Sequence, residues 1–433
     1  MIKTMNYRYW QIPLVLIFIA IYSLLFYTVL TKERILDFTS FYTALLTLIN
    51  NENPYRVLFT TFFPVAQKVS ANLNPPIVLW LAKPLSYFSY QTALTLWTFL
   101  SLLLGLIAAG LSFHHAFSTQ FLKKNRLYLY LFYLSLFSTM MNISIVQLGS
   151  VLFFFIMVGY HFYLKKHNYL AGIFWGLIIA MKLFPALLFF YVLKQRRFKV
   201  LIVMLVTFLL ASLLPLVIDG PAIYSNYYSM MSRVLWYGDS WNASIYGYLF
   251  RLFIDNRNTS QSLIPIQTLY LILFFISLIW YLKKLGPCEK DSINHQPFCL
   301  TLTMMLFMSP FGWLYYFPML TLPLLLSWIM ASEDKRTPLK SMLLWILCLF
   351  LINFPLGYVR TRDMPNFAIR ISFSSCYFYG LFLLTYLLTL KEKISGYREI
   401  HLSEIEHHFI PVTLIILAFG LIATTLRFSL HLY

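Results

Sequence analysis

The stretch AGIFWGLIIAMKLFPALLFFYVLKQRRFK, residues 171–199, determines how the rest of the chain can be threaded through a membrane. The apolar run that contains it, residues 169–193, is long enough to span a bilayer, but Lys182 and Pro185 interrupt its middle. Proline breaks the hydrogen bonding of a helix, and a charge at that depth is costly unless it lines a cavity. We therefore interpret the run as two short helices that enter and leave the membrane, with the basic tail on the cytoplasmic side.

The composition of the whole chain excludes a soluble protein. Of 433 residues 60% are hydrophobic and 11% charged, too little polar material to cover the surface of a soluble protein of this length. We predict one integral membrane domain over residues 1–433, an all-α polytopic bundle of about 11–13 transmembrane helices. The runs that cross or nearly cross the bilayer are 12–30, 91–113, 127–145, 148–164, 169–193, 200–218, 263–282, 298–312, 313–331, 341–357, 371–390 and 409–428.

The basic residues indicate the orientation and exclude nucleic acid as a partner. The net charge of +18 comes from short clusters between apolar runs, which is the pattern of cytoplasmic loops. With the N-terminus inside and residues 169–193 as an in-and-out pair, 20 basic residues lie inside and 11 outside. A single span there would invert everything after it and is disfavoured. The prediction is a cytoplasmic-membrane protein with long outer loops at 31–76 and 219–262 and a cytoplasmic loop at 391–408.

The first outer loop contains ILDFTSFYTALL, residues 35–46, where Asp37 stands between a span and an apolar segment. We predict an interfacial helix on the outer membrane surface with Asp37 at or near its start. Asp37 is a candidate N-cap of that helix and also a carboxylate whose raised pKa would suit a general base, and the two roles do not exclude each other. The apolar positions that follow helical spacing are Phe38, Phe41, Tyr42, Leu45, Leu48 and Ile49.

Other outer groups suit the binding of a sugar and a phosphate. Lys182 either serves a functional site or extends its ammonium group to the membrane surface. Aromatic rings stack on sugars but also form interfacial belts, and guanidinium groups bind phosphate or lipid headgroups. Neither a Gly-rich nucleotide motif nor a metal-binding histidine spacing occurs, so we expect no cofactor and no metal. The candidate substrate contacts are Tyr42, Gln147, Asn242, Trp313, Tyr315, Tyr316, Arg360 and Arg362.

Six segments, in order along most of the chain, resemble glycosyltransferase family 87, a polytopic family of the GT-C class. The stretch at 171–199 resembles the family's Ala-Gly…Lys-x-x-Pro segment with its basic tail. Two sites depart from the family pattern: Tyr315 stands where the family often has histidine, and Leu-Gly-Ser follows Gln147. The other segments are DFTSFYTALLTLINNENPY (37–55), NPPIVLWLAKPLSYFSYQTALTLW (74–97), VQLGSVLFF (146–154), NASIYGYLFRL (242–252) and SPFGWLYYF (309–317).

This resemblance implies a GT-C-type bundle and an inverting transferase that uses a polyprenyl-phosphate sugar. The sugar is expected to be mannose or another hexose, with a pentose as the alternative, and the acceptor a lipid or glycan. The family's first outer-loop aspartate aligns with Asp37. The resemblance therefore implies that Asp37 is the general base. Lys182 is the candidate for stabilising the leaving phosphate, with Arg360 and Arg362 as helpers. The active site would face outward.

Two other functions remain open from the sequence. A transporter or flippase of lipid-linked saccharides usually has internal repeats and midplane charges. This chain has no evident repeat, and its one deep charge, Lys182, lies toward one side. A saccharide polymerase or ligase would carry a large outer loop rich in arginine, whereas the loop at 219–262 has few. The sequence does not predict an oligomeric state.

Overall fold

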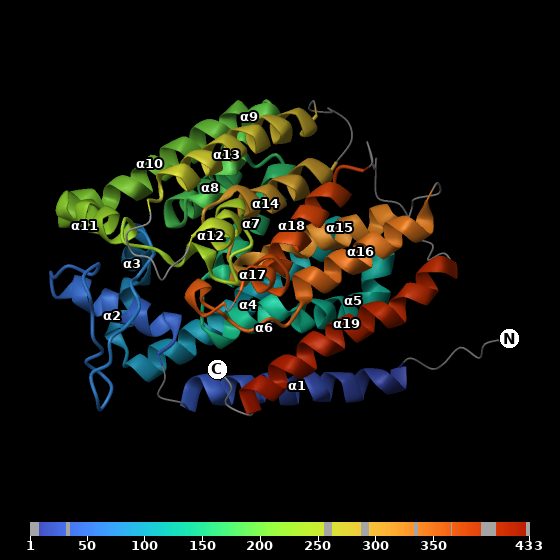
Figure 1. Cartoon of the computed structure of the whole chain (residues 1–433), viewed down its shortest axis with the longest axis horizontal. Helices are drawn as coiled ribbons and strands as arrows, with labels where there is room; N and C mark the ends of the chain where they lie inside the picture. The colour runs from blue at the N-terminus through green and yellow to red at the C-terminus, as the bar shows by residue number, and fades with distance from the viewer. Residues whose placement is uncertain are drawn as a thin grey trace.

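The computed structural model describes residues 8–31, 35–254, 262–286, 294–332, 337–364, 366–390 and 404–429. Over these ranges it is a bundle of helices, and it confirms a polytopic membrane protein (Figure 1). By length and composition, 6 helices among the described residues can cross a membrane, or up to 7 if a bent pair forms one span. These are Gln11–Thr31, Tyr90–Ala116, Phe198–Asp219, Ile264–Lys284, Leu314–Ser332 and Phe367–Leu387.

Several predicted spans correspond to helices that are shorter than a span, so the predicted number of crossings stays a prediction. The run at 127–145 is not one straight helix: α5 (Thr119–Ser135) and α6 (Phe137–Ser144) meet at 60°. The run at 313–331 begins with a 3-10 helix. The other short apolar helices among the predicted spans include α7 (Gly149–Leu164), α8 (Asn168–Met181), α14 (Gln296–Met308) and α16 (Pro338–Asn353).

The stretch at 171–199 turns back on itself as predicted. Helix α8 ends at Met181, a 3-10 turn covers Phe184–Ala186, and α9 runs over Leu187–Lys194. Arg197, just after α9, donates a hydrogen bond of 3.0 Å to the Asn168 side chain at the start of α8. Because the two ends of the stretch touch, α8 and α9 begin and end close together, and Lys182 lies at the tip between them.

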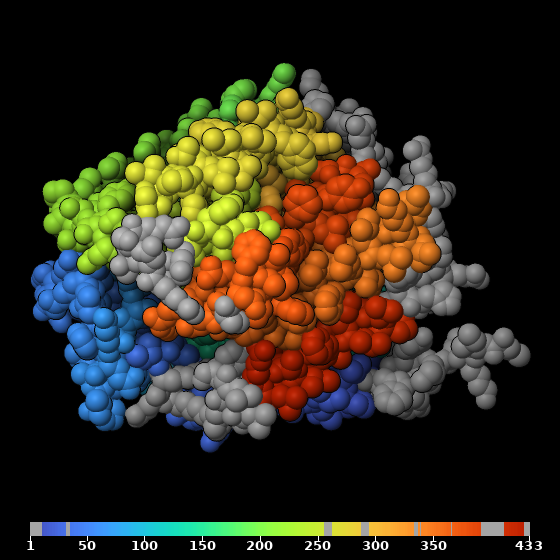
Figure 2. All heavy atoms as spheres, in the orientation of Figure 1, coloured from blue at the N-terminus to red at the C-terminus, as the bar shows by residue number. Residues whose placement is uncertain are grey.

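The two predicted outer loops meet at one end of the bundle. In Figure 1, helices α2 (Asp37–Ile49), α3 (Pro76–Ala82) and α11 (Ala222–Met231) gather there, and in Figure 2 the blue atoms of the first loop meet the yellow-green atoms of α11 at that edge. The Trp80 indole of α3 donates to the Asp219 carboxylate over 2.6 Å. The tip at Lys182 lies at the same end of the bundle. The predicted outer segments therefore form one continuous structure.

Helix α2 differs from the prediction in two respects. Leu36 occupies the N-cap, and its amide donates to the Thr39 hydroxyl over 2.9 Å, so Asp37 is the first helical residue and not the N-cap. The helix does not rest on a surface by one face, because its polar positions Ser40 and Thr43 are also buried in protein. Distant segments cover most of α2, among them Trp97 of α4 (Tyr90–Ala116), which contacts Phe38 and Phe41, and a helical pattern alone does not reveal this.

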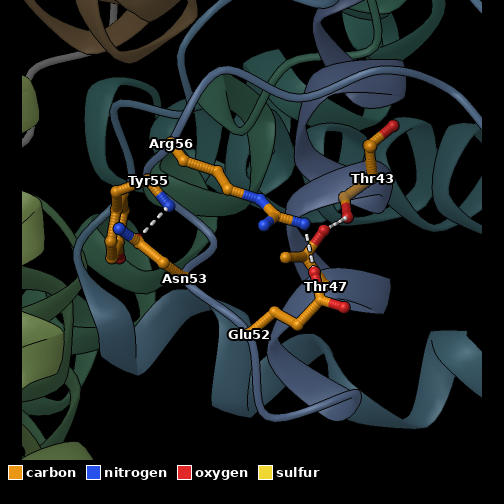
Figure 3. A network of polar contacts seen from close by, with 6 residues as sticks. All are labelled: Thr43, Thr47, Glu52, Asn53, Tyr55 and Arg56. Atoms are coloured by element: carbon orange, nitrogen blue, oxygen red, sulfur yellow. Dashed lines mark hydrogen bonds and ion pairs between the residues drawn. The ribbon is translucent and has the colours of Figure 1, made fainter.

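The chain after α2 folds into a compact polar turn, shown in Figure 3. The Thr47 hydroxyl donates to the Thr43 carbonyl over 2.8 Å, and Arg56 forms an ion pair with Glu52 (Figure 3). The Tyr55 hydroxyl donates to the Asn74 carbonyl over 2.9 Å. These contacts fix the first outer loop against the Asn-Pro-Pro segment that leads into α3.

Candidate functional site

A cavity of about 2330 Å³ lies among the predicted outer loops. Both of these loops contribute to its walls, together with the tip between α8 and α9 and the segments around residues 309–316 and 357–362. Its charged lining is strongly basic, which favours an anionic ligand. Two acidic and seven basic side chains line it among the described residues: Asp37, Asp239, Arg56, Lys68, Lys182, Arg233, Arg360, Arg362 and Arg427.

Asp37, Gln147 and Lys182 come together at one side of this cavity. Asp37 opens α2, Gln147 lies in the turn before α7, and Lys182 is at the α8–α9 tip. The Gln147 side-chain amide donates to an Asp37 carboxylate oxygen. The Lys182 ammonium donates to the Leu73 carbonyl over 3.1 Å. The sequence predicted all three as site residues, and the structure joins an acid, an amide and a cation that are far apart along the chain.

The environment of Asp37 shifts its ionisation. The carboxylate is exposed to the cavity, yet the surrounding protein keeps most bulk water away from it. This desolvation raises the pKa of Asp37, because the charged form loses hydration. The hydrogen bond from Gln147 and the positive charge of Lys182 act in the opposite direction and lower it. Asp37 is therefore a better proton acceptor than an ordinary surface aspartate.

An aromatic wall faces this group. Trp313, Tyr315 and Tyr316 line the cavity, and the Trp313 and Tyr315 rings lie 5.9 Å apart with nearly parallel planes. The wall approaches the Gln147 turn closely at Gly149, where an added Cβ would lie 1.8 Å from the Tyr315 carbonyl oxygen. Glycine is needed at this position so that the start of α7 can pack against the wall.

Tyr42 and Asn242, predicted as substrate contacts, do not line the cavity. The Tyr42 hydroxyl donates to the Phe88 carbonyl over 2.6 Å. The Asn242 amide donates to the carbonyls of Tyr237 and Pro310, each over 2.8 Å, and its oxygen accepts from the Gly312 amide over 3.0 Å. In both residues, the side-chain polar atoms that were expected to contact a substrate are hydrogen-bonded to backbone groups of the protein.

We expect Asn242→Ala to destabilise the protein. The change leaves the Gly312 amide and two carbonyls without this partner, and each buried polar group so stranded costs about 1–3 kcal/mol. The measurement is the midpoint of thermal unfolding in detergent. The control is Asn125→Ala, because the amide of Asn125 makes a single hydrogen bond, of 3.1 Å, to the Phe121 carbonyl. Equal midpoints for the two variants would contradict the structural role of Asn242.

Arg360 and Arg362 line the cavity from a loop that contains one short 3-10 turn, Thr361–Asp363. Asp239, for which the sequence predicted no role, holds this loop. One of its oxygens accepts from the Thr361 amide over 2.9 Å and from the Thr361 hydroxyl over 3.1 Å, and the other accepts from the Tyr358 hydroxyl. In the sequence, the only sign of a role for Asp239 was that it is one of the few acidic residues in the predicted outer loops.

The fold and the cavity together define a polytopic membrane protein with a basic cavity built by the loops predicted to lie outside. The chain belongs to glycosyltransferase family 87, because the model of that family matches residues 72–310, more than half of its length. It is therefore a membrane glycosyltransferase. The match includes Gln147, Lys182 and Asp239, whereas Asp37 precedes it. Neither the comparison with curated proteins nor the comparison with solved structures finds a match.

The described residues hold no group of three or more metal-ligating side chains in suitable positions.

Proposed function

We propose that this protein transfers a sugar, a hexose such as mannose, from a polyprenyl-phosphate donor to a lipid or glycan acceptor at the outer face of the cytoplasmic membrane. The observation that carries the proposal is the placing of Asp37 and Lys182 at one side of a single large cavity. A general base and a fixed cation are the two groups that direct displacement of a phosphate from a sugar requires.

The apolar part of the cavity supports a lipid-linked donor. From the tip at Lys182 the lining continues along α9 to Phe190, and it includes Phe208 of α10 (Phe198–Asp219). On α13 (Ile264–Lys284) the lining extends from Leu263 to Phe274, about 16 Å of helix. Little of α10 or α13 is buried inside the protein. An isoprenoid chain would find an apolar surface there that is continuous with the charged end.

The proposed mechanism is a single displacement. The acceptor hydroxyl oxygen attacks the anomeric carbon while its proton passes to the Asp37 carboxylate. The bond between the anomeric carbon and the phosphate oxygen breaks, and the polyprenyl phosphate leaves with the bonding electrons. Lys182 stabilises the negative charge on that phosphate, assisted by Arg360 and Arg362. The aromatic wall of Trp313, Tyr315 and Tyr316 offers apolar faces to the sugar ring.

The anomeric configuration of the product tests this mechanism. The purified protein is supplied with a polyprenyl-phosphate hexose of known configuration, and the product linkage is determined by NMR. A single displacement inverts the configuration. Retention would contradict the proposed role of Asp37, because retention requires two successive displacements.

Gln147→Leu should move the acid limb of the pH–rate profile to higher pH. The hydrogen bond from Gln147 lowers the pKa of Asp37, so its loss raises that pKa further. A general base works only in its deprotonated form. As the pH is lowered, the variant therefore loses activity at a higher pH than the wild type does. The control is Gln91→Leu, since the Gln91 amide donates to the Leu30 carbonyl and does not line the cavity. An unshifted profile in Gln147→Leu would show that Asp37 does not set the acid limb.

A further inference from the structure

Residues 239–242, here called the clamp, connect two walls of the cavity that come from distant parts of the chain. On one side the Ser240 amide donates to the Val359 carbonyl over 3.0 Å, and the Val359 amide donates to the Ser240 hydroxyl over 2.9 Å. The Trp241 indole donates to the Leu356 carbonyl over 2.9 Å. With the bonds of Asp239 to Thr361, these contacts fasten the clamp along the loop that carries the cavity arginines.

The other side of the clamp holds the aromatic wall. The Leu314 amide donates to the Trp241 carbonyl over 2.9 Å, and the Ala243 amide donates to the Gly312 carbonyl over the same distance. Asn242 adds its two bonds to Pro310 and Gly312. One short segment thus sets the position of the aromatic wall relative to the arginine loop.

A buried arginine, Arg251, is hydrogen-bonded to the backbone of the clamp. The Arg251 side chain of α12 (Ile245–Phe253) is 0% exposed. Its guanidinium donates to the Asp239 carbonyl over 3.1 Å, to the Asn242 carbonyl over 2.8 Å and to the Ser375 hydroxyl over 2.9 Å. One guanidinium nitrogen thus bonds both the Asp239 and the Asn242 carbonyl, which holds the first and last residues of the clamp at a fixed separation.

We propose that Asp239 is a positioning residue that orients Arg360 for the negatively charged phosphate of the substrate. This inference rests on the proposed function. Asp239 is 2% exposed and both its oxygens accept hydrogen bonds, so it is poorly placed to act as a base. Arg360 lines the cavity next to Thr361 in the loop that Asp239 holds, and its positive charge favours the ionised form of Asp239. A guanidinium whose backbone is already held loses less conformational freedom when it binds phosphate, and Asp239 holds the next residue, Thr361.

Binding of undecaprenyl phosphate to the purified full-length protein tests the inference in a double-mutant cycle. We expect Asp239→Asn and Arg360→Ala each to weaken binding about tenfold, the order of one charge-assisted hydrogen bond. If Asp239 acts through Arg360, the double variant binds no more weakly than Arg360→Ala alone. Asp363→Asn is the matched control, since this exposed acid of the same loop lies 3.6 Å from Arg362 and does not line the cavity.

The outcomes separate the positioning role from the proposed function. Wild-type affinity in Asp239→Asn, or losses that add up in the double variant, would overturn the positioning role. Failure of the wild type to bind undecaprenyl phosphate would contradict the proposed function instead. Hydrogen exchange then tests the clamp without a ligand. Residues 358–363 should exchange faster in Asp239→Asn than in Asp363→Asn, and equal rates would overturn the inference.

Discussion

Asp37→Asn should reduce sugar transfer by about 10²- to 10⁴-fold, the usual contribution of a general base. The substitution keeps the size of the side chain and its contact with Gln147, but an amide cannot take the proton of the acceptor hydroxyl. The effect should fall on kcat, because the base acts on the reacting hydroxyl and not on the bound donor. The measurement is the initial rate of transfer from a polyprenyl-phosphate sugar with protein reconstituted in lipid.

The control for Asp37→Asn is Glu52→Gln. Glu52 belongs to the same outer loop and pairs with Arg56, yet it is exposed and does not line the cavity (Figure 3). Its loss should leave the rate nearly unchanged, since exposed ion pairs contribute little. Near-normal turnover of Asp37→Asn in protein that inserts and purifies like the wild type would remove Asp37 from the role of base.

Lys182→Met should lower transfer by about 10²- to 10³-fold, the usual effect of removing one fixed group that stabilises charge in a transition state. Methionine preserves much of the apolar stem, so the main loss is the ammonium charge beside the cavity. Two results are expected together. The rate falls because the departing phosphate lacks its cation, and the acid limb moves to higher pH because Lys182 no longer lowers the pKa of Asp37.

The matched control for Lys182→Met is Lys83→Met. Lys83 also stands in an apolar stretch, but its ammonium lies 4.4 Å from the Trp80 ring centroid, and it does not line the cavity. Unchanged donor KM and kcat in Lys182→Met would exclude this lysine from the site. Equal losses in both variants would point to a general effect on folding.

The sequence was sufficient for features that depend on local pattern. Apolar runs predicted the helices, and Pro185 with the basic tail at 194–199 predicted the reversal after Lys182. The unusual chemistry of Asp37 and Lys182 in apolar surroundings marked them as candidates, and the structure places both at one cavity. A charge that is costly where it stands can be recognised without knowing its neighbours.

Features that depend on distant partners could not be predicted. Asp239 and Thr361 are 122 positions apart, and nothing local marks them as a pair. Asn242 was predicted as a substrate contact, whereas the backbone of residues 310–312 takes its amide and its carbonyl oxygen. The burial of α2 likewise depends on which outer segments fold over it. In each case the missing information was which polar groups satisfy one another across the fold.

The most direct test of the central claim is a transfer assay with two donors. Purified protein is incubated with polyprenyl-phosphate-mannose and, separately, with polyprenyl-phosphate-arabinose, each with a mixed membrane-lipid acceptor pool, and the products are analysed by mass spectrometry. The account predicts a hexose added to an acceptor from the mannose donor, with the rate of product formation about 10²- to 10⁴-fold lower in Asp37→Asn. Absence of any glycosylated product with either donor, or near-normal transfer in Asp37→Asn, would contradict it.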